Sequence, residues 1–299
     1  MSPKSFLGWI GALSMTFFVV IVLLPLMVVL TLSGFAKYMS PDIAISGKTV
    51  AVIELDGVIL DSKDVLEQLY KQSADDKVKG IVLRVNSPGG AIGPAQEIYS
   101  AVKKIKEKKP VIASMGTVAA SGGLYASLGA TKIFCQPGTL TGSIGVIMQM
   151  PNVRKISDLI GFEMLTIKSG ALKDAGNPFR EITEQDKSYL QGTVNEAFEQ
   201  FVEAVAESRK LDMAKVREFS DGRIILGSDA VKLGIADGFG DIDSAARAVF
   251  EELKDPLADT ETPTLIYPMD DMKWLKKFIS ISSEISQLLQ GTVKFQYIM

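Results

Sequence analysis

Short apolar runs that favour strands alternate with helical segments along the chain between residues 49 and 149. The strand-favouring runs are 49–60, 80–85, 111–115, 132–135 and 144–149. The segments with helical spacing between them are 62–72, 94–108 and 121–129. Strands joined by helices of this size form right-handed crossover units, which give parallel sheets covered by helices. We therefore expect an α/β fold, although periodicity alone does not separate a spiral of repeated units from a doubly wound sheet.

The chain beyond residue 150 predicts a helix at 152–160 and a strand at 162–167, followed by a loop marked by glycines. A long helix then runs to about Lys210. Thr183 stands at its start with Asp186 three residues later, which is close to a capping box. Helices of this length often form subunit contacts, but packing within the chain explains the pattern equally well.

The N-terminal segment carries no charged residue from Ser5 to Ala36. This stretch is longer than the roughly 20 residues that a helix needs to span a bilayer, and longer than the apolar part of a cleaved signal. We expect residues 1–40 to form an uncleaved membrane anchor. The charges beside it, Lys4 on one side and Lys37 on the other, barely favour either orientation.

The C-terminal segment, 256–299, contains apolar residues at spacings of three and four, which predicts an amphipathic helix. Its apolar seam consists of Trp274, Phe278, Ile281, Ile285 and Leu288. This helix could lie on a membrane surface, against a second subunit, or on its own domain. Between the two ends, residues 41–255 form the expected main domain.

Composition limits the possible chemistry. The net charge is −3 at pH 7, which gives no electrostatic reason to expect a nucleic acid partner. The chain of 299 residues contains no histidine, so a Ser-His-Asp triad and the common zinc sites are impossible. Neither a metal nor another cofactor is expected. The single cysteine, Cys135, lies in an apolar run and is expected to be buried.

A candidate nucleophile stands in the sequence Val-Ala-Ala-Ser-Gly-Gly-Leu-Tyr at 118–125. Ser121 is placed between the strand-like run 111–115 and a helical segment, where its hydroxyl can be presented at a strand-to-helix turn. Small residues around a serine also permit close helix packing, so this motif alone is weak. If Ser121 attacks a substrate, the base that takes its proton in a chain without histidine is a lysine that burial keeps neutral.

Two further motifs suit this chemistry. Lys173 lies in the glycine-marked loop rather than on a charged helical face, although most lysines are solvated surface groups. Gly89 and Gly90 follow the predicted strand 80–85 in a Ser-Pro-Gly-Gly turn. Glycines there leave backbone amides exposed as an oxyanion hole requires, but they also simply make a good turn.

These motifs together resemble peptidase family S49, the membrane-associated Ser-Lys peptidases of the signal peptide peptidase A type, and more distantly the Clp protease and crotonase fold. The matching segments are Asn-Ser-Pro-Gly-Gly at 86–90, Ala-Ala-Ser-Gly-Gly at 119–123, Thr-Gly-Ser-Ile-Gly-Val at 141–146 and Ser-Gly-Ala-Leu-Lys-Asp at 169–174. The resemblance extends from about residue 48 to 253. It implies a spiral α/β domain behind an N-terminal transmembrane helix.

The resemblance also implies a role for each site residue. Ser121 corresponds to the nucleophile and Lys173 to its general base. Ser143 corresponds to the serine that helps hold the lysine amine, and the amides of Gly90 and Gly122 to the oxyanion donors.

The same resemblance implies a peptide substrate, namely remnant signal peptides or other short hydrophobic peptides. It implies a homo-oligomer anchored by one pass in the cytoplasmic membrane, with the catalytic domain outside the cytoplasm. A non-proteolytic membrane scaffold that keeps the fold is the alternative from another class. Acyl-CoA chemistry on the same fold lacks support, because such enzymes usually rely on carboxylates where Ser121 stands here.

Overall fold

The computed structural model describes residues 47–268 and, within the N-terminal segment, only positions 23, 26, 27, 29 and 31. The expected anchor therefore lies almost entirely outside the described residues, and the apolar seam from Trp274 to Leu288 lies wholly outside them. Within the described part of the chain, no helix combines the length and the apolar character needed to cross a bilayer.

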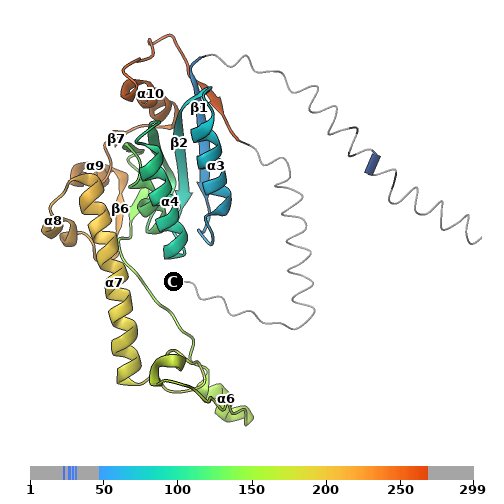
Figure 1. Cartoon of the computed structure of the whole chain (residues 1–299). Coiled ribbons are helices and arrows are strands. Elements are labelled where there is room, and N and C mark those ends of the chain that lie inside the picture. The colour runs from blue at the N-terminus through green and yellow to red at the C-terminus, as the bar shows by residue number, and fades with distance from the viewer. Residues whose placement is uncertain (1–22, 24–25, 28, 30, 32–46, 269–299) are drawn as a thin grey trace, which may run out of the picture. The chain divides into compact units, whose positions relative to one another are not determined.

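An eight-stranded mixed sheet forms the centre of residues 47–268 (Figure 1). Its strands are β1 (Thr49–Asp56), β2 (Val78–Ser87), β3 (Val111–Ala119), β4 (Lys132–Cys135), β5 (Leu140–Gly142), β6 (Ile224–Leu226), β7 (Gly238–Phe239) and β8 (Thr264–Ile266). The strand order is β6-β5-β3-β2-β1-β8, while β4 pairs with β3 and β7. All pairs are parallel except β5 with β6. The expected α/β fold is confirmed.

Helices cover both faces of this sheet. They are α3 (Lys63–Ala74), α4 (Ile92–Ile105), α5 (Gly122–Ser127), α6 (Arg154–Ile160), α7 (Glu184–Arg209), α8 (Met213–Glu218), α9 (Gly227–Leu233) and α10 (Ile242–Glu252), with a 3-10 turn η2 (Ala171–Asp174). Because side chains alternate along a strand, β2 turns Ile81 and Leu83 towards the larger core beneath α4, α5 and α7. Val82 points to the opposite face, where it meets α10.

Two expected strands are absent. Residues 144–149 and 162–167 have no strand structure. Their composition favours strands, but a strand persists only where a neighbour pairs with it and covers its side chains. Ile144 is buried, but Ile147 is 63% exposed and Ile167 is 92% exposed, and no strand pairs with either segment. The strand near this point is β5, which ends at Gly142, just before the first of these segments.

The other expected elements are found. The strand at 132–135 has the predicted bounds. The long helix is α7, and its capping box is complete: Asp186 N donates to Thr183 Oγ1 at 3.1 Å, and Thr183 N donates to the Asp186 carboxylate at 3.0 Å. Cys135 is buried as expected. The sequence did not predict β8, which lies within 256–299 and pairs with β1.

We expect Phe250→Ala to lower the free energy of unfolding by about 3–5 kcal/mol, because it empties a fully buried site beneath the sheet. Phe250 is 1% exposed and packs in the cluster that contains Val82 and Ile112. Urea unfolding measures the effect. Phe239→Ala is the matched control, since Phe239 is 52% exposed and should change stability by much less. Equal losses for the two variants would contradict this assignment of the core.

Candidate active site

Ser121 stands in a strained turn between β3 and α5. Its backbone has φ 51° and ψ −120°, a region that residues other than glycine rarely adopt. Two hydrogen bonds hold it there: Ser121 N donates to Gly142 O at 2.9 Å, and Tyr125 N donates to Ser121 O at 2.9 Å. Such strain persists only where the surroundings impose it, so the backbone position of Ser121 is fixed by its neighbours.

Ser87 joins the turn at Ser121 to the glycine loop that follows β2. This residue is wholly buried. Its carbonyl accepts a hydrogen bond from Ala120 N at 3.0 Å, and its hydroxyl accepts one from Gly89 N at 3.1 Å. One side chain and its own backbone therefore set the distance between the two loops.

Ile59 fixes the glycine loop from the opposite side. Ile59 N donates to Gly89 O at 2.9 Å, and Ala91 N donates to Ile59 O at 2.7 Å. These bonds form an isolated parallel bridge between Ile59 and Gly90. A Cβ atom on Gly90 would lie 2.2 Å from Ile59 O, so only glycine fits there.

The amides of Gly90 and Gly122 come together beside Ser121. A Cβ atom on Gly122 would lie 3.3 Å from Gly90 N, and one on Gly89 would lie 2.9 Å from the Ser121 Cβ. Within residues 47–268, neither amide donates a hydrogen bond. Two unpaired backbone donors next to a serine hydroxyl form the arrangement that stabilises a developing oxyanion.

Ser143 follows directly on the residue that anchors Ser121. Gly142 O accepts the Ser121 amide, and Ser143 N donates to Arg223 O at 2.8 Å. Ser143 itself has a positive φ of 49°. The structure thus brings four of the five expected site residues to one end of the sheet: Ser121, Gly90, Gly122 and Ser143.

Lys173 is not among them in the single chain. It lies exposed on η2, which packs against the start of α7. The other part of α7 packs on the serine region, where the Phe201 and Tyr125 rings have centroids 5.0 Å apart. From Asp186 in the first turn to Phe201, the helix extends about 22 Å at roughly 1.5 Å per residue. The expectation that Lys173 is buried therefore does not hold within one chain.

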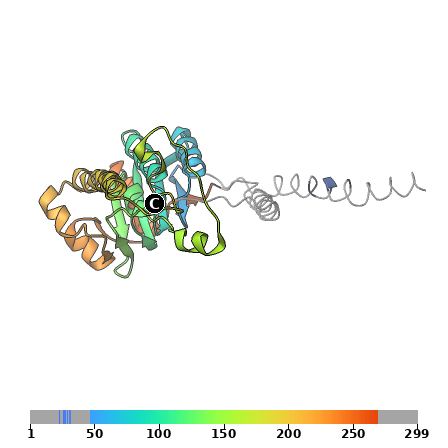
Figure 2. The ribbon, with the colours of Figure 1, turned by 90° about the horizontal axis from the view of Figure 1, so that it is seen from below.

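Residues 144–183, which we call the arm, carry Lys173 away from the sheet. Figure 1 shows the arm leaving the sheet, passing α6 and returning to the lower end of α7, and Figure 2 views α7 nearly along its axis. The arm exposes large apolar side chains: Ile147, Ile156, Leu159, Ile160, Phe162, Met164, Leu165, Ile167 and Ile182. An apolar surface of this kind is typical of a protein interaction site.

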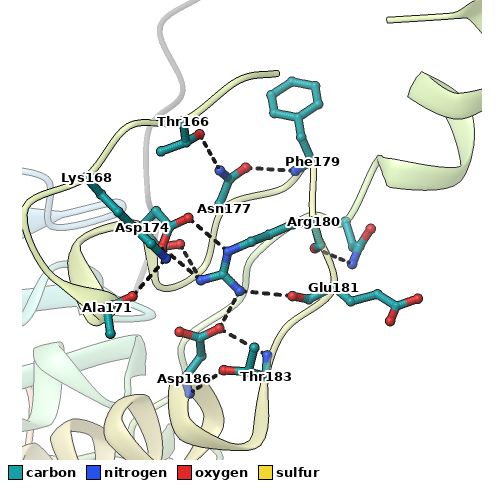
Figure 3. A network of polar contacts seen from close by, with 11 residues as sticks. Thr166, Lys168, Ala171, Asp174, Asn177, Phe179, Arg180, Glu181, Thr183 and Asp186 are labelled. Atoms are coloured by element: carbon teal, nitrogen blue, oxygen red, sulfur yellow. Dashed lines mark hydrogen bonds and ion pairs between the residues drawn. The ribbon is translucent and has the colours of Figure 1, made fainter. Parts of the chain in front are cut away.

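An ion-pair network ties the arm to α7 (Figure 3). Arg180 binds both oxygens of the Asp174 carboxylate and also reaches Asp186. The Arg180 guanidinium, with Lys168 beside it, lowers the pKa of Asp174 to about 2. Arg180 together with Thr183 also holds the pKa of Asp186 far below its usual range. Sequence reasoning missed Arg180, as well as Ser87 and Ile59; only Ser87 fell within a recognised motif.

We expect the stability with which the arm is held on α7 to be independent of pH from neutral solution down to about pH 4. A depressed carboxyl pKa stabilises the folded form above its ordinary value of about 3.9, and this contribution is lost as the pH falls through about 2. Hydrogen-exchange protection of residues 168–182, corrected for the intrinsic rate at each pH, measures this. Amides of β2 report global unfolding as the control. Loss of protection confined to 168–182 near pH 6 would contradict the network.

The described residues contain no group of three His, Cys, Asp or Glu side chains that could hold a metal ion.

Comparison with known proteins places the sequence in a family. Residues 103–255 match the Peptidase family S49, and residues 51–140 match the Clp protease family. A Synechocystis protein named as a candidate protease is 40% identical over 195 residues, which cover 64% of this chain and 70% of that protein. A ClpP1 mutant from Listeria monocytogenes aligns with 68% of this chain and 96% of its own, at 18% identity and a TM-score of 0.46.

Two further relatives carry more specific names. A protein of Enterococcus faecium named as a candidate signal peptide peptidase, SppA, is 37% identical and covers 70% of this chain and 65% of its own length. Protease 4 of Salmonella typhi is 32% identical and covers 70% of this chain, but this chain covers only 35% of that protein. The chain belongs to peptidase family S49, a family of serine peptidases.

Proposed function

We propose that this chain is a membrane-anchored serine endopeptidase in which Ser121 is the nucleophile and Lys173 the general base. The observation that carries the proposal is the convergence of the strained Ser121 turn with the unpaired amides of Gly90 and Gly122. Family membership supports the same assignment. The absence of histidine from the whole sequence supports a lysine as the base.

The reaction follows from these positions. Ser121 Oγ attacks the carbonyl carbon of a peptide bond while its proton passes to a neutral lysine amine. The tetrahedral oxyanion is stabilised by the Gly90 and Gly122 amides, which need no reorganisation because neither has another partner. The C–N bond then breaks as the lysine gives the proton to the leaving amine. Water repeats the two proton transfers and releases the acyl group from Ser121.

In our proposal, the lysine comes from a second copy of the chain. Within one chain, Lys173 is separated from the serine region by most of the length of α7. An amine in water is protonated at neutral pH and cannot accept a proton, so the base also has to be covered. A second copy packed on the apolar arm would bury both the exposed side chains and the amine. This supports a homo-oligomer in which neighbouring copies complete each site.

Co-expression of Ser121→Ala with Lys173→Ala chains tests the nucleophile, the base and their sharing together. Each variant alone is expected to be inactive against a peptide. In a randomly mixed oligomer whose sites each take the serine from one copy and the lysine from another, about a quarter of the sites would combine an intact serine with an intact lysine, so about a quarter of the activity should return. Peptide hydrolysis per subunit is the measurement.

The other outcomes separate the alternatives. No recovery on mixing would contradict sharing between copies. If a Ser121→Ala chain still replaces the wild-type protein in the cell, the non-proteolytic scaffold is favoured. The exposure of Lys173 in the single chain is the observation that supports this alternative. Labelling of wild-type protein by a serine-reactive phosphonate at a residue other than Ser121 would rule out the proposed nucleophile.

Gly90→Ala is expected to lower kcat by about 100 to 1,000-fold, the usual cost of losing one oxyanion donor. The new Cβ atom would lie 2.2 Å from Ile59 O, so the loop must move and take the Gly90 amide with it. Steady-state kinetics on a peptide measure the loss. Gly93→Ala is the matched control, because a Cβ atom on Gly93 meets nothing within 4 Å. Equal activity of the two variants would contradict the oxyanion assignment.

The proposed substrates are remnant signal peptides or other short hydrophobic peptides. The name of the Enterococcus faecium relative supports this substrate class. A peptidase held at a bilayer by the uncharged segment from Ser5 to Ala36 would meet such peptides as they leave the membrane. In the proposal the anchor crosses the cytoplasmic membrane once, and the catalytic domain lies outside the cytoplasm.

A further inference from the structure

Arg180 makes an unusually complete set of contacts for a residue on an exposed arm. Its Nε and Nη2 atoms donate to the two Asp174 carboxylate oxygens at 2.9 and 3.0 Å, and Nη2 also donates to the Asp174 carbonyl at 3.0 Å. Its Nη1 atom donates to the Asp186 carboxylate and, at 2.9 Å, to Glu181 O. Figure 3 shows the guanidinium lying between the two acidic side chains.

The first of these contacts fixes the backbone that carries Lys173. Asp174 is the next residue in η2, and Arg180 holds both its carboxylate and its carbonyl. On the other side of Lys173, Lys168 Nζ donates to Ala171 O at 3.0 Å and also binds Asp174. Lys173 N itself donates to Gly170 O at 3.1 Å. The main chain on both sides of Lys173 is thus held, while its side chain extends outward.

The contact between Arg180 and Asp186 fixes the direction in which η2, and with it Lys173, faces. The Asp186 side chain is only 3% exposed and already belongs to the capping box with Thr183. It is part of α7, whose distant half packs into the core through Phe201 and Val202. A helix transmits position along its length, so Arg180 connects the turn at Lys173 to a rigid element whose C-terminal half is anchored in the core.

We propose that Arg180 is the positioning residue for the general base, holding η2 on the capped start of α7 so that Lys173 projects in one direction. This role rests on the proposed function of Lys173. Arginine suits it because its planar fork can bind two carboxylates and a carbonyl at once, which a lysine at the same place cannot do. The neighbouring Lys168 binds Asp174 at one point only and does not reach Asp186.

Arg180→Lys tests the proposal, because it keeps the charge and removes the fork. We expect kcat for a peptide to fall by about 100-fold with little change in KM, since a misplacement of about 1 Å can cost that much. Asp174→Asn, which weakens the same contact from the other partner, should lower kcat in the same direction. Arg217→Lys is the matched control: Arg217, on α8, also forms a two-point pair with a carboxylate of α7, that of Glu199, but both side chains are exposed.

A double-mutant cycle separates positioning from general stability. The rate at which a serine-reactive phosphonate labels Ser121 is measured in wild-type, Arg180→Lys, Lys173→Ala and doubly substituted chains. If Arg180 acts only through Lys173, Arg180→Lys lowers the rate in the wild-type background and has no effect in the Lys173→Ala background. Equal losses in both backgrounds would overturn the proposal, as would unchanged kcat for both Arg180→Lys and Asp174→Asn.

The cycle also distinguishes this proposal from the proposed function. An inactive Lys173→Ala chain beside fully active Arg180→Lys and Asp174→Asn chains would overturn the role of Arg180 alone. A fully active Lys173→Ala chain would overturn the general base itself, and the positioning role with it.

Discussion

The hydrogen bonds of Ser87 hold the candidate site together. Its carbonyl accepts a hydrogen bond from the Ala120 amide in the serine turn, and its hydroxyl accepts one from the Gly89 amide in the glycine loop. Because Ser87 is wholly buried, water does not compete for either bond, and losing one would leave a buried polar group without a partner. The positive φ of Ser121 and the approach of the Gly90 and Gly122 amides both depend on this connection.

The proposed nucleophile, Ser121, and the proposed base, Lys173, are supported by different parts of the fold. The serine turn lies on the sheet and is packed from outside by α5, whose Tyr125 ring contacts Tyr99 and Phe201. Lys173 lies on the arm, which is held by charge: Arg180 links it to the first turn of α7. The apolar side chains of the arm remain uncovered in a single chain. In the proposed mechanism, a second copy that covers the arm completes the site.

Local sequence signals predicted the capping box at Thr183 and Asp186, because its cause lies within a few residues. The strand 132–135 was predicted from its strand-favouring composition, and the fold supplies partners for it in β3 and β7. Residues 144–149 and 162–167 were expected to be strands on composition, but no strand pairs with them. No sequence motif marked Arg180 either. Its role depends on the carboxylates of Asp174 and Asp186, which only the folded chain brings to it.

The sequence by itself determined the α/β class, the exclusion of histidine chemistry, and four motifs that identified the family. Those are properties of composition and of short spacings, which do not depend on how the chain folds in space. The tertiary structure decided which motifs meet. It brought Ser121, Ser143, Gly90 and Gly122 together, because β2, β3 and β5 are neighbours and end at the same edge of the sheet. It kept Lys173 away, because α7 is a rigid helix with the serine region near one end and η2 at the other.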